Sequence, residues 1–225
     1  MVYILNIETS TKNCSVSIAE NGKLISLREL NSGGYSHAEK LHPFIQDCMS
    51  EAKLTFQQVD AIAIGKGPGS YTGLRIGVSA AKGLCFANDI PLISINSLEV
   101  LANSSQVESG VIIPLIDARR MEVYSAIFGI NYTLIRETQA EIIDESSFLP
   151  YLEKGKVHFL GDGAEKCKET LVHKNACFID GKFPSAESMS HLSFDKFQNN
   201  DFENVAYFEP FYLKDFVVTP QKRKS

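Results

Sequence analysis

The chain has 225 residues, 44% of them hydrophobic, and a net charge of −5 at neutral pH, so it is long enough to bury a sizeable core in two compact lobes. The acidic balance argues against tight, independent binding to nucleic acid, for which a basic stripe is typical. No apolar run is long enough to span a bilayer, and the N-terminal residues lack the charged region of a signal peptide, so we expect a soluble, cytoplasmic protein.

The first hundred or so residues alternate strand and helix signals. The dipeptide Asn21-Gly22 between two apolar-alternating runs predicts an antiparallel meander. Capping-box spacing from Ser36 and helical periodicity predict a first helix, with its first turn disturbed by Pro43. The expected elements are strands at 2–8, 14–19 and 23–30, a helix at 37–52, a helical turn at 55–58, a strand at 61–64, a helix at 72–88, a strand at 91–95 and a helix at 97–103.

The polar stretch 103–110 is the best candidate for a hinge, and we divide the chain there into lobes 1–104 and 105–225. Beyond it the pattern partly repeats. The expected elements are strands at 111–117, 122–128, 132–136 and 157–160 and helices near 146–153 and 164–172. Duplicated halves of this order indicate an α/β fold of the actin, sugar kinase and Hsp70 superfold, which is ribonuclease H-like, with mixed sheets flanked by helices and a ligand cleft between the lobes.

A glycine-rich turn follows the strand at 61–64. Its four glycines between residues 65 and 73 would let backbone N–H groups converge on an anion or on an incoming backbone, although a purely structural turn remains an alternative. Neither standard phosphate motif is complete, because Ser70 replaces a glycine of the dinucleotide fingerprint and Lys66 is not followed by Ser or Thr. We assign nucleotide binding here to Gly67, Gly69 and Arg75. Arg75 opposes the helix dipole, which a phosphate or an internal carboxylate could reverse.

The helix at 72–88 has two apolar stripes. Leu74, Val78, Ala81 and Cys85 form one, and Ile76, Ala80, Gly83 and Ala87 form the other. One stripe would cover the sheet, which leaves the small-residue stripe for a helix of this chain or of a partner. We predict that this stripe and the large apolar residues of the first helix form an interface. Its residues are Leu41, Phe44, Ile45, Cys48, Ile76, Ala80, Gly83 and Ala87.

Two polar groups are further candidates for chemistry. Glu8 and the three hydroxyl residues after it end the first strand, where they could hold a phosphate's metal or water, and ordinary turn chemistry explains them equally well. Asp117, Arg119, Arg120 and Glu122 form a charged cluster at a strand turn. Such a cluster is usually a solvated hairpin and only sometimes a ligand site.

The residues that commonly bind metals do not form a recognisable site. His37 and His42 are five residues apart, which separates them by about 140° on a helix, so they cannot readily grip one ion. We expect His37 to serve the helix start or the interface. The five cysteines are odd in number and contain no CxxC pair, as is typical of reduced, buried thiols. No metal site is therefore expected.

Four stretches taken together resemble one known family. They are IETSTKNCSVSI at the start, SHAEKLHPFI in the first helix, GPGSYTGLRIGVSAAKGL in the centre and EPFYLKD near the end. These stretches are similar to the TsaB (YeaZ) family, and the resemblance covers essentially the whole chain. It implies a duplicated actin-like fold in the non-catalytic subunit of the bacterial complex that makes threonylcarbamoyladenosine in tRNA.

The same resemblance implies partners. One is TsaD, the catalytic paralogue, which transfers a threonylcarbamoyl group from its adenylate to the adenosine beside the anticodon of ANN-reading tRNAs; the ATPase TsaE joins them. In the family the first and central helices of the first lobe form the dimer interface, including homodimers when TsaB is alone, and they match residues 37–52 and 72–88. The resemblance implies no cofactor of the chain's own, a possible nucleotide site shared with TsaD, and tRNA contact only within the complex.

Two enzymatic interpretations remain as alternatives. A metallopeptidase of the glycoprotease type needs a metal pair and a water-activating carboxylate, but HExxH is absent and the histidine spacing is wrong. An actin-like, ATP-dependent kinase usually presents an aspartate at the end of the first strand, where this chain has Glu8. Turnover by the isolated chain distinguishes both from a non-catalytic subunit.

Overall fold

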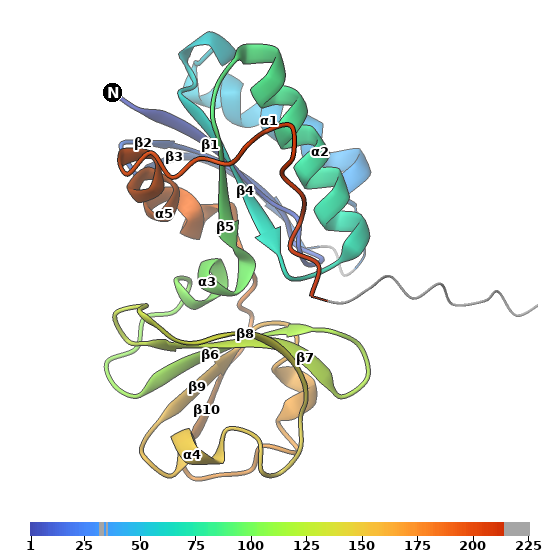
Figure 1. Cartoon of the computed structure of the whole chain (residues 1–225), viewed down its shortest axis with the longest axis vertical. Helices are drawn as coiled ribbons and strands as arrows, with labels where there is room; N and C mark the ends of the chain where they lie inside the picture. Colours follow the sequence, from blue (N-terminus) through green and yellow to red (C-terminus); the bar gives the residue numbers. More distant parts are fainter. Residues whose placement is uncertain (32–33, 35, 214–225) are drawn as a thin grey trace, which may run out of the picture.

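The structure is a computed structural model that describes residues 1–31, 34 and 36–213. Two five-stranded mixed sheets lie one above the other, with the short helix α3 (Ser97–Ala102) between them (Figure 1). The first sheet contains β1 (Tyr3–Glu8), β2 (Cys14–Glu20), β3 (Lys23–Leu30), β4 (Ala61–Gly67) and β5 (Leu92–Asn96). The second sheet contains β6 (Val111–Asp117), β7 (Glu122–Gly129), β8 (Leu134–Ile142), β9 (Val157–Leu160) and β10 (Ala176–Ile179).

The two sheets repeat one topology. Their strand orders are β3-β2-β1-β4-β5 and β8-β7-β6-β9-β10. In each sheet the first three strands in chain order form an antiparallel meander. The fourth strand pairs parallel with the first, and the fifth pairs parallel with the fourth. At the centre of the first sheet, Leu5 lies opposite Ile18 on one side and Ile62 on the other. The predicted duplication is confirmed.

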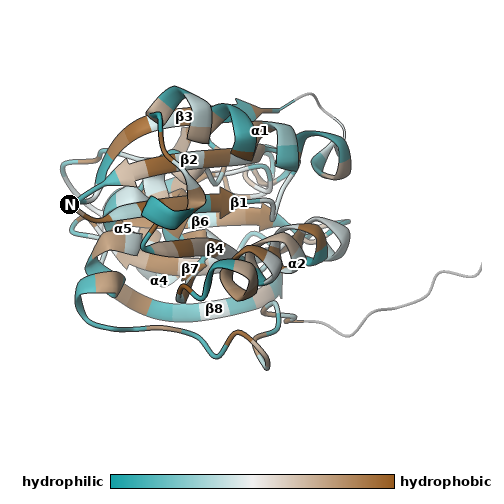
Figure 2. Ribbon diagram, turned by 90° about the horizontal axis from the view of Figure 1, so that it is seen from above, coloured by the Kyte–Doolittle hydropathy of each residue, from teal (hydrophilic) through white to brown (hydrophobic). Residues whose placement is uncertain are grey.

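Helices cover both faces of the first sheet. On one face lie α1 (His37–Ala52) and α2 (Tyr71–Asn88), which pack on a core that includes Leu5 and Ile7. On the other face lies α5 (Ala186–Gln198), which packs on a core that includes Ile4. The alternation follows from the strand period of two. Figure 2 shows the apolar colouring concentrated in β1, β2 and β4, which these helices enclose.

The second sheet is covered more thinly. Leu98 and Leu101 of α3 pack on one face of it, so α3 closes the space between the two sheets. The other face is covered by the single turn α4 (Leu149–Leu152), by the 3-10 turn η2 (Glu165–Cys167) and by the loops around them. Phe159 of β9 lies at the centre of this face, with its ring 5.6 Å from that of Phe148.

The helix α2 sits directly on the loop that follows β1. A Cβ added at Gly77 would lie 2.2 Å from Oγ1 of Thr9, and one added at Gly73 would lie 2.1 Å from the Thr9 carbonyl oxygen. Thr9 Oγ1 donates to the Gly73 carbonyl at 2.9 Å. Only glycine allows this approach, which explains why the helix tolerates residues of low helix propensity.

The segment from residue 203 to 213 crosses the first lobe beside α2. Lys82 Nζ donates to the carbonyl groups of Ala206 and Phe208 at 3.2 and 2.8 Å. The backbone N–H of Phe211 donates to the carbonyl of Lys66 at 2.8 Å. The segment thus ties α2 to the end of β4.

The predicted elements of the first hundred residues are all observed, including the 3-10 turn η1 (Phe56–Gln58). Three expectations in the second half need correction. The strand at 132–136 is the longer β8, the helix at 146–153 is only the turn α4, and the helix at 164–172 is only the turn η2. Phe148 has a left-handed φ of 61°, so a regular helix cannot run through it. The elements β10 and α5 were not predicted.

The predicted lobe division at residues 104 and 105 stays a prediction. Residues after 185 form α5, which contacts β1, β2 and β5, so the end of the chain contributes to the packing of the first sheet. Within the described ranges, none of the helices is long and apolar enough to cross a lipid bilayer.

The two glycines Gly77 and Gly83 provide a matched test of this packing. Gly77→Ala is expected to lower the free energy of unfolding by about 1 to 3 kcal/mol, because its Cβ has no space against Thr9. Gly83→Ala meets nothing within 4 Å and is expected to raise it by up to about 1 kcal/mol through helix propensity. Urea unfolding followed by circular dichroism measures both, and equal effects of the two variants would contradict the packing described.

Candidate functional site

The helix α2 has a face that points away from the sheet. We call it the α2 outer face; it consists of Ile76, Ala80, Gly83, Phe86 and Ala87. Phe86 is 86% exposed, and Gly83 beside it is open, since a Cβ there would touch nothing within 4 Å. The exposed Phe86 ring protrudes from the helix, and the helix surface beside it at Gly83 carries no side chain. A second helix can pack against such a surface, with the ring in a groove between its side chains.

Three of the eight predicted interface residues lie in the core and not on the surface. Leu41, Ile45 and Cys48 are buried in the core beneath α1, and Cys48 Sγ donates to the Val16 carbonyl at 3.4 Å. They hold α1 on the sheet and offer no surface to a partner. Phe44 is half-buried at the edge of the same core. An interface role for the other five, Phe44, Ile76, Ala80, Gly83 and Ala87, stays a prediction.

Phe86 was missed by the sequence analysis. At helical spacing Phe86 lies on the same side of α2 as the polar residues Arg75, Ser79 and Lys82. It therefore belongs to neither apolar stripe. A large aromatic residue on an otherwise polar helix face was the signal that could have identified it. Lys82 itself is occupied by the carbonyl groups of residues 206 and 208.

The glycine turn after β4 packs against backbone. A Cβ at Gly69 would lie 2.2 Å from the Ser10 carbonyl oxygen, and Ser70 N–H donates to that same oxygen at 2.6 Å. A Cβ at Gly67 would lie 2.8 Å from the Leu74 side chain and 3.3 Å from the Phe211 carbonyl oxygen. These contacts match the expected approach of an incoming backbone. Nucleotide binding by Gly67 and Gly69 stays a prediction.

Arg75 contacts two tyrosine side chains. Its guanidinium lies 4.1 Å from the centroid of the Tyr71 ring, and Nε donates to the Tyr212 hydroxyl at 3.3 Å. The rings of Tyr71 and Tyr212 are 5.0 Å apart. The hydrogen bond to Tyr212 is the largest cause that raises the pKa of Arg75. The charge of Glu209 also raises the pKa of Arg75, so the two tyrosines and a carboxylate of this chain stabilise the cation; nucleotide binding by Arg75 stays a prediction.

Glu8 is enclosed at the end of β1. Its Oε1 accepts from the Ser10 N–H at 2.7 Å, and its Oε2 accepts from Ser97 Oγ at 2.9 Å. Gly65 leaves just enough room, because a Cβ there would lie 2.1 Å from Oε2. Burial raises the pKa of Glu8, although the Ser10 and Ser97 hydrogen bonds oppose the rise. The carboxyl group links β1 to α3 and does not open to solvent.

His37 stands at the start of α1, where it was expected. Its ring is buried and donates from Nε2 to the Thr11 carbonyl at 2.8 Å, and burial lowers its pKa. His42 points to solvent on the same helix. Among the residues that the structure describes, no three His, Cys, Asp or Glu side chains gather where they could hold one metal ion.

The cysteines are unpaired thiols, and all but Cys177 are buried. Burial raises the pKa of Cys14 and Cys167 to about 11 and that of Cys85 to about 12. A thiol with so high a pKa is almost entirely protonated at neutral pH, so it is a poor nucleophile and a poor metal ligand. The expectation of reduced, buried thiols agrees with these surroundings for four of the five.

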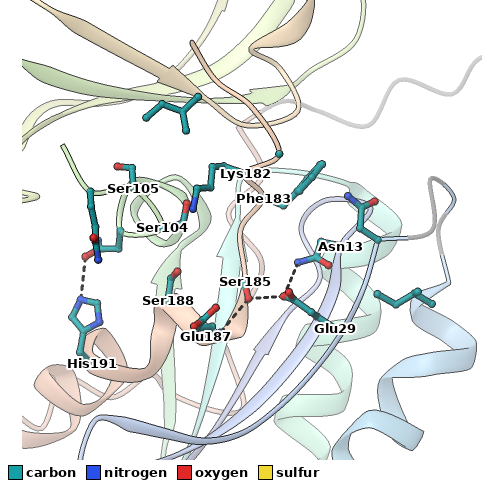
Figure 3. Close-up of a pocket in the computed structure, with 16 residues that line it drawn as sticks. Asn13, Glu29, Ser104, Ser105, Lys182, Phe183, Ser185, Glu187, Ser188 and His191 are labelled. Carbon is teal, nitrogen blue, oxygen red and sulfur yellow. Dashed lines mark hydrogen bonds between the residues drawn. The ribbon is translucent and has the colours of Figure 1, made fainter. Parts of the chain in front are cut away.

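A polar cavity of about 1000 Å³ lies where α5 meets the ends of β2 and β3 and the connection after α3 (Figure 3). On one wall the carboxylate of Glu29 accepts from Ser185 Oγ at 2.8 Å and from Asn13 Nδ2 at 3.4 Å. On another wall His191 Nε2 donates to Oδ1 of Asn103 at 3.0 Å. None of the predicted site residues lines it, because α5, which brings the walls together, was not predicted.

The repeated topology and a close structural match define a duplicated actin-like, ribonuclease H-like α/β protein, as predicted. The matching structure, YeaZ from Pseudomonas aeruginosa, has a TM-score of 0.83 and 26% identity, over 95% of this chain and 100% of that one. A family model described as TsaD, tRNA N6-adenosine threonylcarbamoyltransferase, matches residues 33–218. The chain belongs to the TsaB (YeaZ) family, as the sequence resemblance predicted.

Two bacterial relatives share this family and match at nearly full length. The tRNA threonylcarbamoyladenosine biosynthesis protein TsaB of Escherichia coli (strain K12) is 30% identical over 226 residues, which cover 96% of each chain. The protein of the same description from Haemophilus influenzae is 28% identical over 228 residues, which cover 96% of this chain and 94% of that one.

The buried carboxyl group of Glu8 predicts a pH effect. Its folded-state pKa is raised above the unfolded value of 4.5, so its contribution to stability is fully present below that value and is lost as the pH rises through the folded-state pKa. Glu8→Gln keeps an acceptor for Ser10 and can pair with Ser97. We expect the variant to be more stable than the natural chain at about pH 8, and to lose that advantage towards about pH 4.

The measurement is the free energy of unfolding in urea across that pH range. Glu153→Gln, a change at an exposed carboxylate, serves as the control. A constant difference between Glu8→Gln and the natural chain at all pH values would show that Glu8 is not held as described.

Proposed function

We propose that this chain is the non-catalytic adaptor subunit for the biosynthesis of threonylcarbamoyladenosine in tRNA. It pairs with a TsaD-type transferase, which a TsaE-type ATPase joins, for modification of the adenosine beside the anticodon in ANN-reading tRNAs. The names of its relatives support the pathway. The observation that carries the adaptor role is the α2 outer face, with Phe86 exposed beside the open Gly83.

The energetics favour a partner helix on this face. Burying the Phe86 side chain is worth about 2 kcal/mol, and the half-buried Ile76 and Ala80 would add apolar area around it. Gly83 and Ala87 let a second helix backbone come within the 8 to 10 Å typical of packed helices. Buried aromatic anchors of this kind carry a large share of the binding energy in protein interfaces.

The partner's fold is expected to be like that of this chain, because a TsaD family model matches residues 33–218. Two related folds can present the corresponding helices to each other across an approximate twofold axis. In the absence of the transferase, a second copy of this chain can occupy the same face as a homodimer. We place the complex in the cytoplasm, with tRNA contacted only after assembly.

Neither enzymatic interpretation is favoured by a specific observation. The Glu8 carboxyl group, which a kinase of this superfold would need for metal and phosphate, is surrounded by Ser10, Ser97 and Gly65. A nucleotide site shared with the transferase remains part of the proposal. Gly67, Gly69 and Arg75 lie at the N-terminal end of α2, where a partner docked on the α2 outer face could complete it.

Substitutions on the α2 outer face test the adaptor role. Gly83→Arg and Phe86→Glu each place a charge in the proposed contact, and we expect either to weaken binding to the TsaD-type protein by at least about 100-fold. Val172→Glu is the matched control, since Val172 is 81% exposed in the other lobe. Size-exclusion chromatography measures the complex, and circular dichroism confirms that each variant folds. An undiminished complex with both α2 variants would count against the proposal.

Reconstitution tests the non-catalytic role. Modification of an ANN-reading tRNA is expected to require this chain together with the transferase and the ATPase, while the chain alone neither hydrolyses ATP nor modifies tRNA. Modified nucleoside, measured by mass spectrometry after digestion of the tRNA, is the readout. Turnover by the isolated chain would assign it an enzymatic role.

A further inference from the structure

The turn between β6 and β7 has an unfavourable backbone for its residues. Arg119 and Arg120 both have left-handed backbone angles, with φ of 73° and 51°. Two consecutive positive φ values at a hairpin turn strongly favour pairs such as Asn-Gly, and side chains other than Gly, Asn and Asp rarely adopt them. Residues held in such conformations cluster at functional sites, so the two arginines need an explanation beyond the fold.

The backbone of this turn is firmly braced. The Arg119 N–H donates to Oδ1 of Asp117 at 2.9 Å, and the Glu122 N–H donates to the Arg119 carbonyl at 3.2 Å. Lys166 pairs with Asp117 and donates to the carbonyl groups of Arg120 and Glu122 at 2.6 and 2.7 Å. The turn is therefore a rigid support for its side chains.

The two arginine side chains are free to bind something else. Both are exposed, and neither guanidinium makes a hydrogen bond or an ion pair with another residue in the described part of the chain. The other described arginines are all engaged. Arg28 pairs with Glu51, Arg75 with the tyrosines and Arg136 with Glu141. Asp117, which with Glu122 flanks the two arginines in sequence, pairs with Lys166.

A partly buried carboxyl group lies next to the turn. Asp162 accepts the Asp117 N–H at 3.0 Å, next to the turn. Burial raises the pKa of Asp162, and the hydrogen bond from the Asp117 N–H and the charges of Lys12 and Lys166 oppose that rise. Lys12 is itself exposed, in the loop after β1. In Figure 1 the turn connects β6 and β7 at one end of the second sheet, and Arg119, Arg120 and Met121 within it are exposed.

We propose that Arg119 and Arg120 bind the phosphate backbone of tRNA within the assembled complex. An open, rigid turn with paired guanidinium groups suits an extended polyanion, since arginine binds phosphate through two parallel hydrogen bonds. A mononucleotide would need an enclosing pocket. The turn does not line the polar cavity beside α5, nor the smaller pocket formed by Lys66 and residues 203–212. The net charge of −5 keeps the isolated chain from binding nucleic acid tightly. This inference rests on the proposed function.

The test replaces the arginines with residues that the turn prefers. Arg119→Asn combined with Arg120→Gly is expected to keep or raise the melting temperature and to leave assembly with the TsaD-type protein unchanged. In the reconstituted complex the KM for tRNA should rise roughly tenfold with little change in kcat, and the slope of log(kcat/KM) against log salt should become shallower by about 1.5 to 2. Arg119→Lys with Arg120→Lys should retain most of the salt slope.

Lys154→Ala with Lys174→Ala removes two other exposed cations of the second lobe and is the matched control. An unchanged KM for tRNA and an unchanged salt slope in the Asn-Gly variant would overturn the inference while leaving the adaptor role intact. A raised KM for ATP at an unchanged salt slope would also overturn it, in favour of a mononucleotide site. Failure of the natural chain to support modification at all would instead contradict the proposed function.

Discussion

The close packing of α2 on the loop after β1 determines which residues of the helix face solvent in the first lobe. The backbone of α2 lies against the Thr9 carbonyl at Gly73 and against the Thr9 hydroxyl at Gly77, and Gly69, just before the helix, lies against the Ser10 carbonyl. This contact sets the rotation of α2 about its own axis. Leu74 and Val78 consequently enter the core, while Gly83 and Phe86 face outward. The surface proposed for the partner is thus a consequence of glycines on the opposite, buried side of the same helix.

The last residue of β1, directly before this loop, connects the two sheets. Glu8 at the end of β1 binds Ser97 at the start of α3, and α3 packs on the second sheet through Leu98 and Leu101. A carboxyl group that could hold a metal in an open cleft here serves as a buried structural link. The end of the chain reinforces the junction, because α5 returns to the first sheet after the second is complete.

The sequence predicted the first lobe well because its signals are local. Helical periodicity, a capping residue and a hairpin dipeptide lie within a few residues of each other, and α1, α2 and the meander all followed. The helix α5 was missed because half of its buried positions are serines. Ser190 and Ser193 lie on its inner side, and Ser193 donates to the Ser190 carbonyl at 3.2 Å, so no apolar stripe marks the helix. The cavity built by α5 could not be foreseen without it.

The candidate site was predicted in part, for a similar reason. An apolar stripe on a helix predicts that its side chains are buried, but it does not show whether they are buried by the sheet or by a partner protein. In α1 they are buried by the sheet. In α2 the exposed members were identified correctly as small residues, whereas Phe86 was hidden among polar neighbours. From the sequence, Arg119 and Arg120 were identified only as part of a charged cluster. Their left-handed backbone angles could not be predicted, because they are a property of the folded hairpin.

The most direct measurement of the central claim is amide hydrogen exchange of this chain with and without the TsaD-type protein, read by mass spectrometry. The account predicts slower exchange in peptides from residues 76–88 and from the adjoining turns of α1 on complex formation, with no change around His191 and the polar cavity. Slower exchange confined to the cavity or to β8, with α2 unaffected, would contradict it.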